Sequence, residues 1–69
     1  MNAKVLAKIL VIEPKSRKET FIKKYYVVDY AGDWSTSNQI IQMALKETEL
    51  EVNLINNRIV FWNWKLYIS

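Results

Sequence analysis

Residues 58–69 read RIVFWNWKLYIS, and this stretch decides how the fold is interpreted. It contains four aromatic side chains, Phe61, Trp62, Trp64 and Tyr67. Aromatic and β-branched residues favour strands, and successive side chains of a strand point to opposite faces of the sheet. The stretch therefore predicts a C-terminal strand with large side chains on both faces, which is more apolar surface than one helix can cover.

The preceding segment, Leu50–Leu54, alternates apolar and polar residues and predicts a strand that pairs with this one in a hairpin. Loop length fixes which residues share a face. A two-residue turn at Asn56 and Asn57 places Trp62 and Trp64 on the polar side, whereas a three-residue loop separates apolar from polar residues, so we predict the longer loop. One face then carries the apolar residues Leu50, Val52, Leu54, Val60, Trp62, Trp64, Leu66 and Ile68. The other carries Glu51, Asn53, Phe61, Asn63, Lys65 and Tyr67.

The N-terminal half predicts a second hairpin. The run Val5–Ile12 is rich in β-branched residues and is ended by Pro14, which favours a strand, although Lys4 and Lys8 are also four apart as on a helix. The polar loop Lys15–Thr20 follows, and a second extended run covers Phe21–Tyr30. In that run Ile22, Tyr26, Val28 and Tyr30 are expected to share the buried face.

A helix is expected between the two hairpins. Gly32 is the only glycine, and Thr36 with Gln39 three residues later matches a capping box, so the helix should begin near Ser37. It should run for about three turns, because apolar residues then recur at helical spacing. These residues are Ile40, Ile41, Ala44, Leu45 and, at the end of the stripe, Thr48.

The predicted fold is α+β in one domain over residues 1–69: a ββαββ order, with a four-stranded antiparallel sheet and one amphipathic helix packed on one face. A ten-residue strand spans about 33 Å, whereas a twelve-residue helix spans about 18 Å. One helix therefore leaves part of the sheet uncovered.

Composition excludes several kinds of chemistry. The chain has no cysteine and no histidine, so zinc fingers, thiolate nucleophiles and His-based triads are excluded, and one glycine cannot form a glycine-rich phosphate loop. We therefore expect a protein that is not an enzyme and uses no metal or cofactor. The absence of cysteine fits a cytoplasmic location. The apolar run 3–12 is too short for a bilayer and contains Lys4 and Lys8, so no membrane association is expected.

The uncovered face is the first candidate site. The predicted parity places there Phe21, Tyr25, Phe61, Asn63, Lys65 and Tyr67, of which the aromatic types are enriched in protein interfaces. The leading hypothesis is accordingly a small protein-interaction module that self-associates, or binds another protein, through this face. Cross-strand packing of aromatics and lysines produces similar faces without any ligand.

Charge provides a second candidate. The net charge is +3, and all of it lies within residues 13–24. The basic residues there are Lys15, Arg17, Lys18, Lys23 and Lys24. The alternative function is therefore nucleic-acid binding, with this basic hairpin on phosphates and Tyr25 or Phe61 stacked on bases. A further alternative is a small virus- or plasmid-encoded accessory protein that blocks a host factor.

Overall fold

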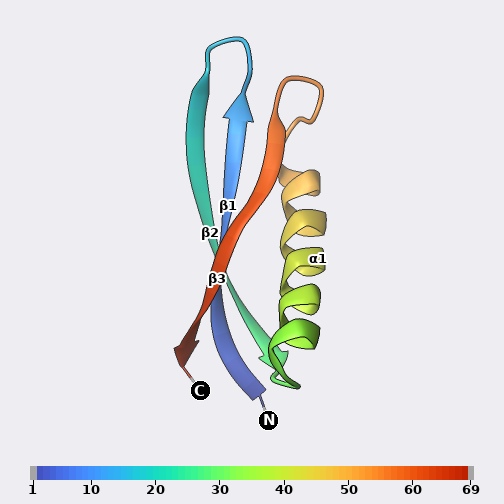
Figure 1. The fold of residues 1–69 in the computed structure, drawn as a ribbon. Helices are drawn as coiled ribbons and strands as arrows, with labels where there is room; N and C mark the ends of the chain where they lie inside the picture. The colour runs from blue at the N-terminus through green and yellow to red at the C-terminus, as the bar shows by residue number, and fades with distance from the viewer. Residues whose placement is uncertain (1, 69) are drawn as a thin grey trace.

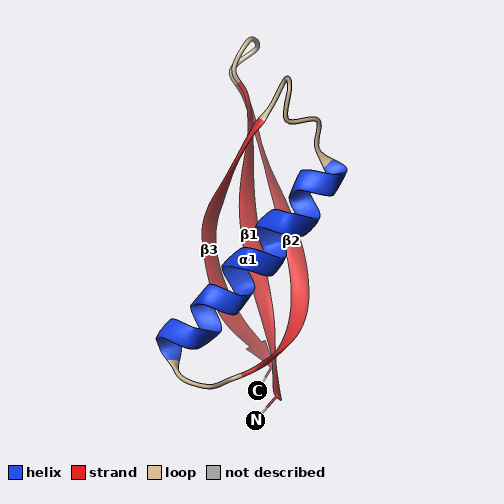
Figure 2. Cartoon of the chain, turned by 90° about the vertical axis from the view of Figure 1, so that its right-hand side faces the viewer, coloured by secondary structure: helices blue, strands red, loops and turns tan. Residues whose placement is uncertain are grey.

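The computed structural model describes residues 2–68, apart from the side chains of Asp33 and Ile68. Four elements follow one another: β1 (Asn2–Glu13), β2 (Lys18–Asp29), α1 (Asp33–Glu51) and β3 (Arg58–Ile68) (Figure 1). The strands form one antiparallel sheet in the order β2-β1-β3, and α1 lies diagonally across one face of it (Figure 2). The α+β class with one helix on an antiparallel sheet is confirmed. The sheet has three strands within the described residues, so the fourth predicted strand is wrong.

The first hairpin is confirmed. β1 and β2 pair along their whole length, from Asn2 opposite Asp29 to Glu13 opposite Lys18. Residues 14–17 form the turn, and Arg17 closes it with a φ of 59°, in the left-handed region that short loops often require. The paired register fixes which side chains of the two strands share a face.

The predicted strand Leu50–Leu54 is instead the end of α1 and the beginning of a loop. The helix continues to Glu51, and the backbone N–H of Val52 donates to the carbonyl of Thr48 at 2.9 Å. Asn53 then organises the loop, because its Oδ1 accepts from the N–H of Ile55 and its carbonyl accepts from Asn57 Nδ2, both at 2.9 Å. Such local bonds of asparagine compete with strand pairing. The predicted second hairpin and its three-residue loop are therefore wrong, and β3 pairs with β1 instead.

The helix also begins earlier than predicted. Asp33 is its first residue, and Gly32 precedes it with a φ of 103°, a conformation that residues with a Cβ rarely adopt. The predicted capping box is not formed. The Thr36 hydroxyl oxygen accepts instead from the N–H of Ala31 at 3.1 Å, which holds the β2–α1 connection against the first turn.

The core lies between α1 and the sheet. Residues four apart along α1, namely Thr36, Ile40, Ala44 and Thr48, are fully buried. They face β1, whose fully buried residues are Val5, Ala7 and Ile9. Trp64 of β3 packs at the margin of this core and donates from Nε1 to Ser37 Oγ at 2.9 Å.

The opposite face of the sheet is covered by no element of residues 2–68 (Figure 1). At about 1.5 Å per residue, the 19 residues of α1 span about 28 Å, and this single layer of helix lies on one side only. The molecule is elongated, at 42 × 18 × 17 Å. Among the described residues, no helix is long and apolar enough to cross a membrane.

Candidate functional site

The candidate site is the face of the sheet that points away from α1, called the open face below. Because Val5, Ala7 and Ile9 are buried under α1, the even-numbered residues of β1 point to the other side. The registers extend this face to both neighbouring strands. Its central residues are Lys4, Leu6, Lys8 and Leu10 of β1, Phe21, Lys23, Tyr25 and Val27 of β2, and Val60, Trp62, Asn63, Lys65 and Tyr67 of β3.

Two aromatic pairs join the outer strands across β1. Phe21 and Trp62 have ring centroids 5.5 Å apart at 72°, and Tyr25 and Tyr67 have centroids 5.0 Å apart at 73°. Edge-to-face pairs of this kind stabilise by about 0.5–1.5 kcal/mol beyond their burial. The four side chains nevertheless remain half exposed, at 45% for Phe21, 54% for Trp62, 51% for Tyr25 and 52% for Tyr67. The rings are thus fixed in position and still accessible.

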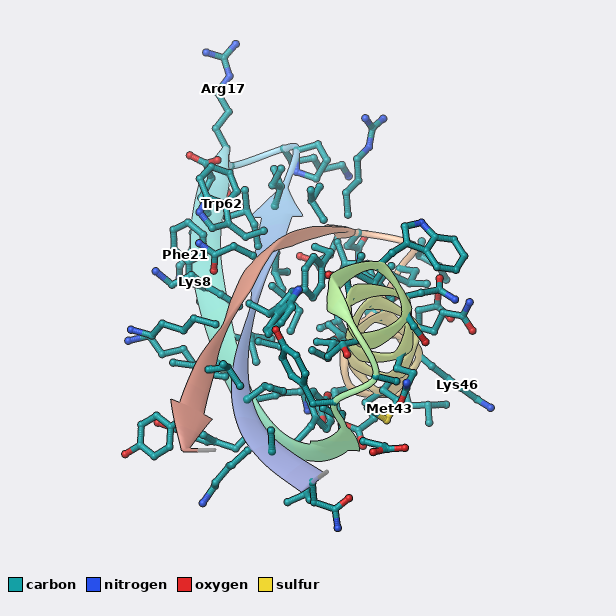
Figure 3. All side chains as sticks on the ribbon, turned by 60° about the horizontal axis from the view of Figure 1, so that its bottom comes forward. Lys8, Arg17, Phe21, Met43, Lys46 and Trp62 are labelled. Atoms are coloured by element: carbon teal, nitrogen blue, oxygen red, sulfur yellow. The ribbon has the colours of Figure 1, made fainter. Side chains whose placement is uncertain are left out.

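Lysines of the central strand lie against these rings. Lys8 Nζ is 4.8 Å from the centroid of Phe21, and Lys4 Nζ is 5.5 Å from Tyr25 and 5.7 Å from Tyr67. Figure 3 shows Lys8, Phe21 and Trp62 together on the side of the sheet opposite α1. Cation–π contacts hold the ammonium groups against the rings, so positive charge and aromatic surface alternate over a short distance.

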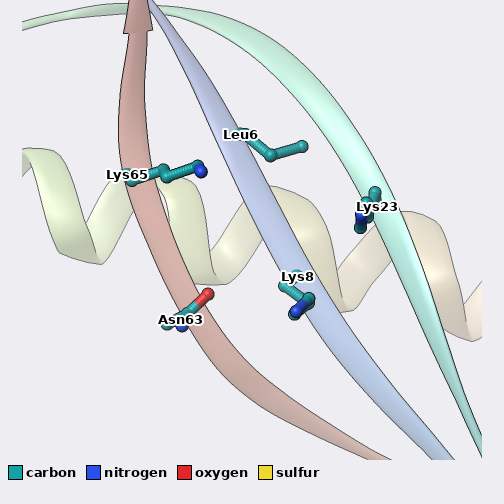
Figure 4. A pocket seen from close by; sticks show the side chains of 5 residues that line it. All are labelled: Leu6, Lys8, Lys23, Asn63 and Lys65. Carbon is teal, nitrogen blue, oxygen red and sulfur yellow. The ribbon is translucent and has the colours of Figure 1, made fainter.

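A hollow lies between the two aromatic pairs, and Figure 4 shows the side chains that line it. It has a volume of about 140 Å³ and is lined by Leu6, Lys8, Lys23, Asn63 and Lys65, which come from all three strands. Lys8 and Lys23 are direct cross-strand partners, an arrangement in which like charges destabilise a sheet. The lining contains no acidic residue.

Within residues 2–68, the central part of the open face carries no acidic side chain. Among the described residues, register places Glu19 and Asp29 on this face, but they lie opposite Ile12 and Asn2, at its two ends. The last turns of α1 carry the opposite charge, with Glu47, Glu49 and Glu51. The molecule therefore has a basic sheet face and an acidic helix end.

A β-bulge changes which aromatic residue reaches the open face. Lys8 pairs with Asn63 and Ile9 with Phe61, so Trp62 is an extra residue without a partner on β1. The extra residue lets Trp62 and its neighbour Asn63 point to the same side of the sheet. Trp62 joins Phe21 on the open face, while Phe61 packs against the core. Phe61 therefore lies on the helix side and not on the predicted face, whereas Phe21, Tyr25, Asn63, Lys65 and Tyr67 lie on the open face.

The basic residues of the alternative site do not form one surface. Lys15, Arg17 and Lys18 lie at the hairpin tip, from which Arg17 extends outward (Figure 3), and Lys23 lies in the hollow. Lys24 points to the helix side, where its Nζ is 2.6 Å from Glu51 Oε1 and 3.8 Å from Glu47 Oε2. Its side chain is only 16% exposed, so Lys24 is occupied in an ion pair with the helix.

Lys4, Lys8 and Trp62 are the charged and aromatic members of the open face that sequence reasoning missed, and Val60, which was expected on the other face, also lies there. A signal for the lysines was present, because Lys4 and Lys8 occupy even positions of a strand whose odd positions are all apolar. Pairing that strand with the next one brings Lys8 opposite Lys23. Trp62 had no such signal, because the bulge depends on pairing with β1 and not on the local pattern of residues 58–69.

No protein-family model matches the chain, and no curated protein or solved structure is significantly similar to it. Among the described side chains, no group of three or more His, Cys, Asp or Glu residues is arranged to hold a metal ion. The function of the protein is therefore inferred from the chemistry of the open face.

Proposed function

We propose that the open face binds single-stranded nucleic acid, with bases stacked on its rings and phosphates held by its lysines. The observation that carries this proposal is the central strip, in which Lys4, Lys8, Lys23 and Lys65 alternate with two half-exposed aromatic pairs and no acidic residue intervenes. Single-strand binding proteins combine a basic path for the backbone with aromatic platforms for the bases. A sheet with exposed rings is a common platform of this type.

The accessibility of the rings favours a single strand over a duplex. Bases in a duplex are stacked on each other, and their edges are read from grooves by helices or two-stranded ribbons. The open face is instead a broad sheet surface whose rings are offered among lysines, which suits unpaired bases. The hairpin tip, which lies beyond Glu19, adds the further positive charge of Lys15, Arg17 and Lys18 along the long axis of the molecule.

A protein interface on the same face is the second candidate, in keeping with the half-exposed Tyr, Trp and Phe side chains. In a symmetric dimer through this face, however, each copy would bring its four lysines against those of the other. Like-charge juxtaposition across an interface is unfavourable. An anionic polymer satisfies both the rings and the lysines, so nucleic acid is the better-supported occupant.

The proposal is tested by fluorescence anisotropy with a labelled, mixed-sequence single-stranded oligonucleotide at two salt concentrations. Trp62→Ala should weaken binding by about 5- to 150-fold, the effect of losing about 1–3 kcal/mol of stacking. Trp34→Ala is the matched control, because Trp34 is 82% exposed but belongs to the first turn of α1. It should bind like the unaltered protein.

Affinity should also fall steeply with salt, because lysine–phosphate contacts release counterions. Equal losses in the two tryptophan variants, or no binding in dilute salt, would contradict the proposal. A duplex that binds as well as the single strand would show that the rings do not stack on bases.

A further inference from the structure

Resting on the proposed function, we infer that the hollow in the centre of the open face is the site for a backbone phosphate, placed between two bases that stack on the flanking aromatic pairs. The hollow is lined by Leu6, Lys8, Lys23, Asn63 and Lys65 (Figure 4). It would thus fix where the backbone crosses the sheet and the order of base, phosphate and base along the strand.

The lining of the hollow carries positive charge and no acidic residue. Lys8, Lys23 and Lys65 approach the hollow from three different strands, and Lys8 and Lys23 are direct partners across the β1–β2 pair. With no acid in the lining, the free protein keeps this repulsion. A phosphate group would be attracted by all three ammonium groups and would relieve it, and the amide of Asn63 supplies a further neutral donor.

The hollow lies between the two aromatic pairs along the direction of the strands. Lys23 lies two residues from Phe21 and two from Tyr25 along β2, so the rings are separated by about 13 Å along the strand with the lysine midway. On β3 the partners Trp62 and Tyr67 are five residues apart, and Asn63 and Lys65 lie between them. A nucleic-acid strand that contacts both aromatic pairs has to pass over the hollow.

Size supports a small anionic group rather than a base. The hollow has a volume of about 140 Å³, and its lining consists of three lysines, Asn63 and Leu6. Cavities that bury drug-sized ligands are larger, about 300–1,000 Å³. The flanking rings are the surfaces suited to bases, and the hollow between them is suited to a phosphate of the backbone that runs from one aromatic pair to the other.

The decisive variant is Asn63→Asp, which keeps the shape of the side chain and adds a negative charge to the hollow. In the free protein the carboxylate should neutralise the lysines and raise the unfolding temperature. In binding it should lower affinity for the oligonucleotide and reduce the slope of log affinity against log salt by about 0.7, the value for one phosphate contact on a single strand. Opposite effects on stability and affinity distinguish a phosphate site from a merely structural role.

Asn56→Asp is the matched control, because it makes the same substitution at an exposed loop position and changes the net charge equally. It should leave the salt slope unchanged. As a direct probe, pyrophosphate should raise the unfolding temperature of the unaltered protein more than sodium chloride of equal ionic strength, since a ligand of the folded state stabilises it. This stabilisation should be lost in Asn63→Asp.

The outcomes separate the two proposals. Oligonucleotide binding that requires Trp62 but weakens equally in Asn63→Asp and Asn56→Asp, with no specific effect of pyrophosphate, would overturn the phosphate site and leave the proposed function intact. Stabilisation by pyrophosphate that depends on Asn63, without binding of any oligonucleotide, would overturn the nucleic-acid backbone as the occupant and the proposed function with it.

Discussion

Tyr26, like Lys24, connects the sheet to the last turns of α1. It lies on the helix side of β2, opposite Val5, and its hydroxyl donates to Glu47 Oε2 at 2.6 Å. Burial, and then the hydrogen bond and charge of Glu47, raise the pKa of Tyr26 well above its usual value. The neutral form of the phenol is therefore favoured by folding.

This raised pKa predicts a loss of stability in alkali. The unfolded chain releases the Tyr26 proton near pH 10, about the usual tyrosine value, whereas the folded chain retains it to higher pH. The contribution of the residue is thus fully present below about pH 10 and falls above it, by at most about 1.4 kcal/mol per pH unit. Tyr26→Phe should be less stable by about 1 kcal/mol at pH 7, and urea unfolding should show this deficit shrinking above pH 10. A deficit that is constant from pH 7 to 11 would contradict the assignment.

At the scale of secondary-structure elements, the β1–β3 pairing has two register shifts, and the β-bulge at Trp62 determines what the open face presents beside Phe21. Without an extra residue, strict alternation would place Phe61 and Asn63 on one side and Trp62 and Trp64 on the other. The bulge lets Phe61 and Trp64 both pack towards the core while Trp62 and Asn63 both reach the open face. One additional residue therefore serves the core and the candidate site together.

Deletion of Trp62 tests this account. Asn63 opposite Lys8 and Phe61 opposite Ile9 would then be neighbours in a regular ladder, so the fold should persist. It should lose only the aromatic pair, about 0.5–1.5 kcal/mol, and the burial of a side chain that is 54% exposed. Oligonucleotide binding should fall as in Trp62→Ala.

Deletion of Trp64 is the contrasting variant. It would move Lys65 opposite the fully buried Ala7, and it should lower the free energy of unfolding by more than about 3 kcal/mol. Circular dichroism during urea unfolding measures both, and equal effects would contradict the bulge assignment.

The bulge and the end of α1 mark where prediction from sequence fails. The first hairpin, the helix and the last strand could be predicted, because Val5–Ile12 and Phe21–Tyr30 have local signals that tertiary contacts reinforce. Leu50–Leu54 alternates like a strand, yet Leu50 is an exposed residue in the last turn of α1 and Asn53 bonds locally to the loop. Five of the six predicted face residues lie on the open face. The sixth, Phe61, was misplaced because its parity depends on a pairing partner distant in sequence.

At the scale of the whole molecule, charge and apolar surface oppose each other on the open face. The rings of Trp62 and Tyr67 favour contact with a second apolar surface, whereas Lys4, Lys8 and their neighbours repel another basic face. Electrostatic repulsion is screened over about 10 Å at 0.1 M salt and about 3 Å at 1 M, while burial of apolar surface is not weakened by such screening. The balance between the two should therefore depend on salt.

Light scattering should accordingly give the mass of one 8.2 kDa chain in dilute salt and a higher mass near 1 M salt. Trp62→Ala should remain a single chain in both conditions, because it removes apolar surface from the open face and keeps the lysines. A saturating single-stranded oligonucleotide should compete with self-association for the same surface and prevent the increase in mass.

An oligomer in dilute salt that dissociates as salt rises would instead indicate that the lysines of one copy bind the acidic end of α1 of another. An oligomer insensitive to both salt and Trp62→Ala would place the contact at the edge strands β2 or β3, whose outer backbone groups are available for pairing with another strand.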